Sequence, residues 1–341
     1  MRSRLFPAVA VLTLLTGVSS ATAYFQGKTN SQDQTRAPDE ESAWVCPMHP
    51  DYTSDTPGTC PRCGMTLVRT APFDVRDYRV EFRTEPAAVK PGQKIKMFFK
   101  FLKPDSAEVV RSFIQVHTKD FHLFVIGQNM DFFEHIHPEM MADGTWTIET
   151  SVPKAGYYKV LCDFFPAGGS SQFLAIPLVT AGYAGDLTAD SAHLRPDKTP
   201  KETDGDLTAT IEYDPEPCVA GMYCHLNITV SDTTSGVPVA DLQTYLGAFG
   251  HMLIMSEDME AYVHSHPLEV TNLSAVLDGD PPEFLIPPDA DLEKIRGGPT
   301  VTFEGLMPKP GLFRAWAQFR RNDKVHTVAF TFNVIAPDST P

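Results

Sequence analysis

The stretch Phe121-His-Leu-Phe-Val-Ile-Gly127, with Glu134-His-Ile-His-Pro138 after it, occurs again as Gly250-His-Met-Leu-Ile-Met255 with Val263-His-Ser-His-Pro267 after it. In each copy an apolar segment and a shorter segment flank a polar turn, which is the pattern of two antiparallel strands. Self-similarity of this kind predicts two homologous structural units in one chain. From Tyr78 onward the sequence is β-like throughout, with Pro-Gly and Asp-Gly turns and no helical period of useful length. We therefore expect each unit to be a β-sandwich of immunoglobulin-like or cupredoxin-like build.

The histidines of each copy follow one spacing, His-x12-His-x-His-Pro. They are His122, His135 and His137 in the first copy and His251, His264 and His266 in the second. If the hairpins pivot at Gln128-Asn129 and Glu257-Asp258, His122 lies opposite His135 and His251 lies opposite His264. The third histidine of each copy lies two residues along and therefore on the same face. Three converging imidazoles are a familiar arrangement for Zn(II) or Cu(II) with one position open.

Other residues on these faces leave two interpretations open. Asp131 and Glu260 fall on the histidine faces, where either could supply a fourth ligand or support a ligand. However, Phe124 and Phe133 share the first face, so the imidazoles could instead be packed core residues. In that case the His-Pro ending simply terminates a strand.

A second metal-binding pattern lies upstream, in Cys46-Pro-Met-His49 and Cys60-Pro-Arg-Cys63-Gly-Met65. The Cys-x2-His and Cys-x2-Cys pairs, separated by a loop, can converge on one tetrahedral centre for Zn(II), Cu(I) or Ag(I). Met48 and Met65 add thioether sulfur, which cuprous ions favour and zinc rarely uses. The plainer alternative is a zinc ion that only holds this small knuckle together.

The segment from Trp44 to Pro50, followed by residues 57–67, resembles the small heavy-metal-binding domain found near the N-termini of copper/silver efflux adaptors and some copper-exporting P-type ATPases. The resemblance covers residues 44–70. It implies four primary ligands and two auxiliary ones, namely Cys46, His49, Cys60 and Cys63, with Met48 and Met65. Neither an ATPase membrane domain nor an adaptor's helical hairpin is visible in the sequence, so only the metal-binding role carries over.

The N-terminus has the features of a secretory signal peptide. Met1-Arg-Ser-Arg4 precedes an apolar run over 5–15 and the small residues Ala21-Thr-Ala23, so we expect cleavage after Ala23. The run is too short for a comfortable membrane span. The mature protein is then periplasmic or secreted, without a membrane span. The full chain has a formal net charge of −15, which argues against nucleic acid and anionic membranes as partners.

The remaining candidates are interpreted more simply. Cys218 and Cys224 flank a short loop, which in an oxidising compartment favours a disulfide over a second thiolate site. Cys162 lies in an apolar run and is expected to be a buried thiol. His117 aligns with Leu246 of the second copy and is expected at the surface.

The fold class is thus mainly β: a small metal knuckle followed by two homologous β-sandwiches. The expected boundaries are a signal peptide at 1–23, a linker at 24–43, the knuckle at 44–70, the first sandwich at 71–184, a second linker at 185–206 and the second sandwich at 207–336.

These features favour an exported heavy-metal-binding protein that captures, buffers or delivers Cu(I) or Ag(I), with zinc as the alternative ion. On this hypothesis the sandwiches supply weaker histidine sites or a docking surface for an efflux or metal-transport protein, and the chain is not an enzyme. A second hypothesis is a zinc-stapled adaptor or binding protein whose histidines only pack. A third is an enzyme with a histidine-ligated copper or zinc centre, although no acid, base or nucleophile stands out beyond the ligands themselves.

Overall fold

The computed structural model describes residues 43–47, 49, 52–62, 64–70, 78–104, 106–268, 270–271, 283–287 and 290–339. Across these ranges the chain is nearly all β, with one short 3₁₀ turn at Pro337–Ser339 and no α-helix. No helix in the described part of the chain could cross a membrane. The expected signal peptide, Met48 and Cys63 lie outside the described residues, as does the expected first linker apart from Ala43.

Three short strands form the knuckle, in the antiparallel order β2-β1-β3. They are β1 (Ala43–Val45), β2 (Thr53–Ser54) and β3 (Val68–Thr70). Its small core consists of Cys46, Cys60 and Leu67, so two candidate ligands also provide the packing. A unit with so little apolar surface gains folding free energy when metal binds.

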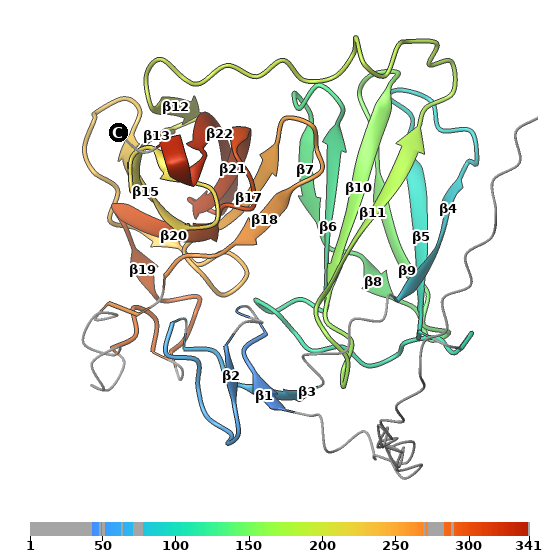
Figure 1. Ribbon diagram of the computed structural model, residues 1–341, viewed down its shortest axis with the longest axis horizontal. Helices are drawn as coiled ribbons and strands as arrows, with labels where there is room; N and C mark the ends of the chain where they lie inside the picture. Colours follow the sequence, from blue (N-terminus) through green and yellow to red (C-terminus); the bar gives the residue numbers. More distant parts are fainter. Residues whose placement is uncertain are drawn as a thin grey trace, which may run out of the picture. The chain divides into compact units, whose positions relative to one another are not determined.

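The first sandwich consists of two four-stranded antiparallel sheets, in the orders β4-β5-β9-β8 and β11-β10-β6-β7 (Figure 1). The strands are β4 (Arg79–Glu85), β5 (Ile95–Leu102), β6 (Phe121–Gly127), β7 (Phe133–Ile136), β8 (Glu139–Met140), β9 (Trp146–Thr150), β10 (Tyr157–Phe164) and β11 (Gln172–Val179). Aromatic rings fill the space between the sheets, and Phe101 stacks on Phe164 with ring centroids 3.9 Å apart. Cys162 of β10 is buried in this core and takes no part in a disulfide, as expected.

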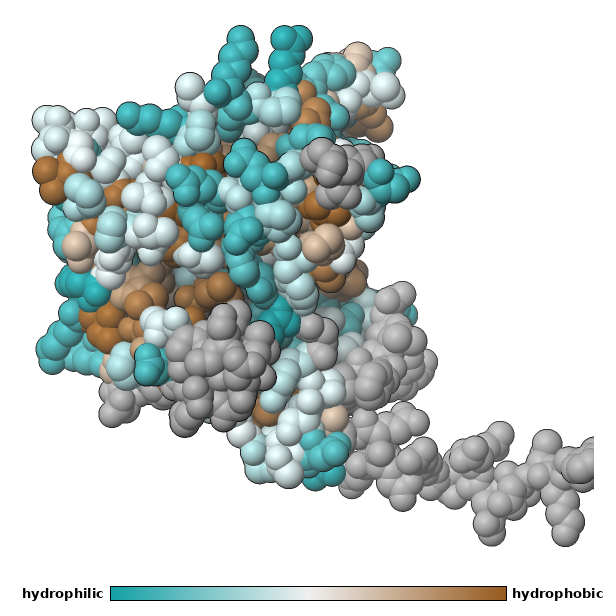
Figure 2. Space-filling model, turned by 60° about the vertical axis from the view of Figure 1, so that its left-hand side comes forward, coloured by the Kyte–Doolittle hydropathy of each residue, from teal (hydrophilic) through white to brown (hydrophobic). Residues whose placement is uncertain are grey.

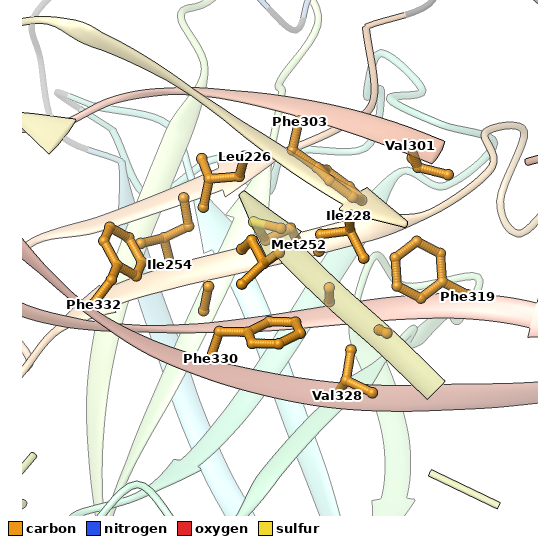
Figure 3. Packing of buried hydrophobic residues seen from close by; sticks show 14 of the residues in the cluster. Leu226, Ile228, Met252, Ile254, Val301, Phe303, Phe319, Val328, Phe330 and Phe332 are labelled. Carbon is orange, nitrogen blue, oxygen red and sulfur yellow. The ribbon is translucent and has the colours of Figure 1, made fainter. Parts of the chain in front are cut away.

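The second sandwich pairs the sheet β12-β13-β15-β20 with a larger sheet built around β14-β22-β21. The strands are β12 (Lys201–Asp204), β13 (Leu207–Asp214), β14 (Cys218–Val219), β15 (Tyr223–Asp232), β16 (Leu242–Gln243), β17 (His251–Ser256), β18 (Tyr262–Ser265), β19 (Arg296–Gly297), β20 (Thr300–Leu306), β21 (Gly311–Arg321) and β22 (Lys324–Ile335). The expected linker at 185–206 therefore ends in a strand, because β12 pairs with β13. Figure 3 shows the apolar core, where Phe303, Phe319 and Phe330 meet Met252 between the sheets.

The disulfide expected between Cys218 and Cys224 is present, with their Cα atoms 5.6 Å apart. It closes the short loop that joins β14 to β15. Both cysteines belong to the buried core of the second sandwich.

Strands β6 and β17 are buried on both faces, and this determines where the histidines lie. In β6, Leu123 and Val125 pack in the core of the first sandwich. Phe124 and Ile126, on the opposite face, pack in an apolar cluster drawn from both sandwiches. Its buried members are Phe124, Ile126, Met130, Leu161, Ala192, Leu253, Met255, Met259 and Trp316. The histidine faces therefore point into the interface between the sandwiches. The outer surface is different, because hydrophilic and intermediate residues cover most of the coloured face in Figure 2.

The predicted register of the first histidine hairpin is wrong by two residues. His135 lies opposite Phe124 and not opposite His122. The reason is a turn centred one residue later than expected, in which the Met130 N–H donates to the Gly127 carbonyl at 2.8 Å and Met130 adopts a φ of 60°. A shift by two residues leaves each side chain on its original face, so the histidines still share one.

The second hairpin shows the same correction. His264 lies opposite Leu253 and not opposite His251. Met259, with a φ of 59°, takes the place that Met130 has in the first hairpin. The repeat seen in the sequence is therefore kept in the turn geometry of both units.

Candidate metal centre

Seven histidines lie together where the two sandwiches meet. They are His117, His122, His135 and His137 from the first sandwich and His251, His264 and His266 from the second. Their candidate ligand atoms gather in two groups, and each group contains histidines from both sandwiches. The sequence predicts three converging histidines within each copy, and in the structure each group also takes histidines from the other sandwich, because the two histidine faces are buried against one another.

The first histidine centre is formed by His122, His135 and His137, joined by His264. Nδ1 of His122 lies 3.1 Å from Nε2 of His135, and Nε2 of His137 lies 3.2 Å from each of these atoms. A tetrahedral metal ion with nitrogen ligands at its usual bond length holds those nitrogens about 3.3 Å apart. The three imidazoles of the first copy therefore converge at ligand spacing, as the sequence predicts.

The hydrogen bonds around this centre show which ring nitrogens of His122 and His135 carry a proton. The other nitrogen of each ring points into the centre with its lone pair. Nε2 of His122 lies 2.9 Å from the Val116 carbonyl, which can only accept, so this nitrogen carries the proton. Nδ1 of His135 likewise donates to Oε1 of Gln318 at 2.8 Å. Each neutral imidazole has one proton, so Nδ1 of His122 and Nε2 of His135 face each other as lone pairs. Two lone pairs at this distance repel each other, and Nε2 of His137 has only one proton to share between them, so a cation among the three rings would relieve the repulsion.

A proton does not fill that role near neutral pH. Burial is the main cause that lowers the pKa of His122 to about 4 and the pKa of His137 to about 3, and neighbouring histidines lower both further. The pKa of His135 is also held well below its ordinary value by burial. The rings are therefore neutral, which is the state in which imidazole binds metal.

His264 is positioned for the first histidine centre by an acidic residue of the other sandwich. Its Nδ1 lies 2.5 Å from Oδ2 of Asp163. Its Nε2 is buried and has no hydrogen-bond partner in the described part of the chain. One candidate ligand atom from each of His122, His135 and His264 lies within 4.8 Å of the others. A carboxylate behind a ligating imidazole is the usual supporting arrangement at metal sites.

The acidic residues expected at this centre lie elsewhere. Asp131 is in the exposed turn of its hairpin and accepts a hydrogen bond from Asn129 at 2.6 Å. Glu260 is exposed and lies 3.8 Å from Lys309. Both sit in turns, because the hairpins pivot one residue later than predicted. Asp163 takes the supporting role instead.

His251 and His266 lie in the second histidine group, together with His117. The surface position expected for His117 is incorrect, since its residue exposure is only 8%. The backbone of His117 nevertheless matches that of Leu246, as the alignment of the two copies predicts. His117 and Thr118 form a tight left-handed turn bridged by Val116 and Lys119, and the second sandwich repeats that turn around Leu246 and Gly247.

In the knuckle, three predicted ligands converge. Nδ1 of His49 lies 3.7 Å from Sγ of Cys46 and 3.6 Å from Sγ of Cys60. Sulfur and nitrogen ligands of a tetrahedral metal ion are about 3.6 Å apart at their usual bond lengths. Met65 packs against the cysteines in the knuckle core.

The knuckle is docked beside the histidines. Arg62 forms an ion pair with Glu304 of β20 and lies over the Tyr223 ring at 4.7 Å. The backbone carbonyl of Glu304 accepts a hydrogen bond at 2.7 Å from Ser265, which separates His264 from His266 in the chain. One residue thus links the knuckle to the ligand-bearing end of β18.

The knuckle also contacts the first sandwich. The Thr70 hydroxyl donates to the Gly169 carbonyl. The pKa of His117 is lowered to about 3, chiefly by burial, and His49 is among the neighbouring charges that lower it further. The knuckle and the second histidine group are therefore electrostatic neighbours.

Comparison with known families gives two matches. The family model described as "Domain of unknown function (DUF8832)" matches residues 73–179 and 201–336, which is more than half of the chain. The model described as "Heavy metal binding domain" matches residues 43–70. Among curated proteins, none matches the sequence.

Solved structures give only distant likenesses. The Escherichia coli adhesin FdeC is 12% identical with a TM-score of 0.21, over 75% of this chain and 63% of the FdeC chain. The Yersinia pseudotuberculosis adhesin InvE is 11% identical with a TM-score of 0.20, over 74% of this chain and 58% of the other. The chain thus spans less than two thirds of either adhesin chain. At these scores the likenesses carry no argument about function.

Proposed function

This protein belongs to the family described as a domain of unknown function (DUF8832), and we propose that it is an exported metal-handling protein in which the knuckle captures Cu(I) and passes it to the histidines between the sandwiches. The single observation that carries the proposal is the pair of facing lone pairs on His122 and His135, 3.1 Å apart beside His137. The single N–H of His137 cannot fully satisfy both lone pairs, and burial keeps the pKa of His122 and His135 low, so a metal ion bridges them better than a proton at neutral pH.

Three features support capture at the knuckle followed by delivery. Thiolate ligands suit Cu(I), and Met65 lies beside the buried Cys46 and Cys60. The Arg62–Glu304 ion pair holds the knuckle next to β18. Imidazoles are weaker ligands for Cu(I) than thiolates, so metal leaves the knuckle only when the histidine centre offers several of them at once.

Export and the absence of catalysis belong to the same proposal. The disulfide between Cys218 and Cys224 is typical of an oxidising compartment. The centre is buried, and the two polar side chains behind it, Asp163 and Gln318, orient the candidate ligands His264 and His135. A carrier needs this arrangement, whereas an enzyme needs access for a substrate. Delivery onward to an efflux or metal-transport protein completes the proposed role.

An anaerobic titration with Cu(I) against a competing chelator tests the proposal, with X-ray absorption on the loaded samples. We expect one sulfur-ligated site and additional nitrogen-ligated metal in the natural chain. Cys60→Ser/Cys63→Ser should lose the sulfur-ligated site and keep the nitrogen-ligated metal, whereas His122→Leu/His137→Leu should keep the sulfur-ligated site and bind less nitrogen-ligated metal. His193→Gln is the matched control, because His193 is exposed and outside the cluster. Zinc bound once, with Cu(I) ignored, would instead identify a zinc-stapled adaptor.

A further inference from the structure

We propose that His117, His251 and His266 form a second histidine site, separate from the first histidine centre, and that it takes a monovalent soft cation such as Cu(I). The inference goes beyond the proposed function, because that role needs only the knuckle and the first centre. The site combines a tight turn of the first sandwich with the β17–β18 hairpin of the second. It is therefore complete only when the two sandwiches are packed together.

The geometry is that of a three-imidazole site. One candidate ligand atom from each of His117, His251 and His266 lies within 4.8 Å of the others. The rings of His117 and His266 have centroids 3.7 Å apart, and those of His251 and His266 have centroids 4.7 Å apart. The exposed fractions of the three residues are 8%, 1% and 5%.

The ring nitrogens supply the second, independent observation. Both nitrogens of His251 and both nitrogens of His266 are buried without a hydrogen-bond partner among the residues that the structure describes. Leaving a buried polar atom without a hydrogen bond is unfavourable. Four such atoms in two adjacent rings are hard to explain as packing. Coordination of a metal ion would satisfy one nitrogen of each ring.

The charge around this group selects the ion. Burial is the main cause that lowers the pKa of His251 and His266, and neighbouring histidines lower both further, so the surroundings of these two rings oppose added positive charge. The desolvation energy of an ion rises with the square of its charge, so a divalent ion pays about four times as much as a monovalent one. The first histidine centre differs, because Asp163 lies behind His264 and offsets positive charge there.

The two sites are neighbours. The rings of His135 and His251 have centroids 5.7 Å apart, and those of His264 and His266 have centroids 4.4 Å apart. Two cations so close repel each other in proportion to the product of their charges. A monovalent ion in the second site therefore tolerates an occupied first centre better than a divalent ion would.

The repeat itself provides the test variant. Leu246 occupies the position of His117 in the equivalent turn, with a φ of 53° against 47° for His117. His117→Leu should therefore preserve the backbone while it removes a ligand. The parent for the test is the full chain with Cys60→Ser/Cys63→Ser, so that Cu(I) reports on the histidines alone. His251→Gln serves as a second variant, and thermal unfolding of each metal-free protein checks the fold.

We expect the parent to bind two equivalents of Cu(I) and His117→Leu to bind one. His122→Leu/His137→Leu in the same background should also bind one, which separates failure of the first centre from failure of this inference. A parent preloaded with Zn(II) at the first centre should still take one equivalent of Cu(I). If folded His117→Leu and His251→Gln both keep two equivalents at unchanged affinity, the second site is overturned. Zn(II) filling both sites would overturn the choice of a monovalent ion.

Discussion

The carboxylate of Asp163 in β10 lies 2.5 Å from Nδ1 of His264 in β18, so a side chain of one sandwich orients a candidate ligand carried by the other. The second sandwich likewise supports a ligand of the first, because Gln318 of β21 accepts a hydrogen bond at 2.8 Å from Nδ1 of His135 in β7. Asp163 and Gln318 each lie opposite the first histidine of the neighbouring strand in their own unit. The two supports therefore occupy equivalent positions of the repeat, but only one of them is charged.

This difference predicts the effect of Asp163→Asn. The amide preserves the size of the side chain but removes the negative charge behind His264. Loss of such a supporting group typically lowers metal affinity about 10–100-fold. Gln318→Glu is the matched variant, and it should raise the affinity because it adds charge at the equivalent position. Chelator competition measures both, and equal affinities for the three proteins would show that the supports do not tune the metal.

A second prediction concerns the docked knuckle. Arg62→Ala removes the ion pair with Glu304 and the contact with Tyr223. We expect slower passage of Cu(I) from the knuckle to the histidines, with equilibrium affinities unchanged, because no ligand is altered. Protein that holds one equivalent of Cu(I) at the knuckle is mixed with a second equivalent, and X-ray absorption on freeze-quenched samples follows the appearance of nitrogen-ligated metal. Arg62→Lys keeps the charge, so its transfer rate should lie between that of the natural chain and that of Arg62→Ala. Identical transfer rates would rule out a role for docking.

The sequence predicts the architecture well because both signals on which it depends are local. Strand alternation and the internal repeat indicate two β-sandwiches, and the Cys-x2-His and Cys-x2-Cys spacing indicates the knuckle. The shared face of His122, His135 and His137 also follows from alternation alone. These predictions survive a register error of two residues, since a two-residue shift returns each side chain to the same face.

The pairing of histidines between the sandwiches could not be predicted in the same way. Which surfaces of two units meet is a tertiary property, and only the nearly continuous apolar run of β6 hints that both of its faces are buried. The sequence wrongly predicts a surface position for His117, because Leu246, the equivalent residue of the second copy, has no metal-binding side chain. Asp163 is far in sequence from His264, and only the packing of the sandwiches brings them together.

The disulfide supports a third prediction, about stability. Cys218 and Cys224 are six residues apart, and closing so short a loop stabilises a fold by roughly 2 kcal/mol in the chain-entropy model. Cys218→Ser/Cys224→Ser should lower the free energy of unfolding by about that amount. Urea denaturation of the metal-free protein measures the loss. Adding a reductant to the natural protein should reproduce it, and no change in either experiment would contradict the prediction.

The last prediction is that the metal-free protein loses stability as the pH falls below about 6.5, the ordinary pKa of histidine in an unfolded chain. Burial lowers the folded-state pKa of His122 to about 4 and of His137 to about 3. Between these values and 6.5 the unfolded chain binds more protons than the folded one, so acid favours unfolding. Above 6.5 these histidines are neutral in both states and contribute no pH dependence.

Urea midpoints of metal-free protein at pH 7.5, 6 and 5 measure this slope. Because His122→Leu/His137→Leu removes two of the responsible groups, its midpoint should change less with pH than that of the natural chain. His193→Gln should retain the full slope, since His193 is exposed. Bound metal should steepen the dependence, because protons then compete with the ion for the same nitrogens. A stability that stays flat from pH 7.5 to 5 would mean that the histidines are solvated in the folded protein, and the buried centre would have to be abandoned.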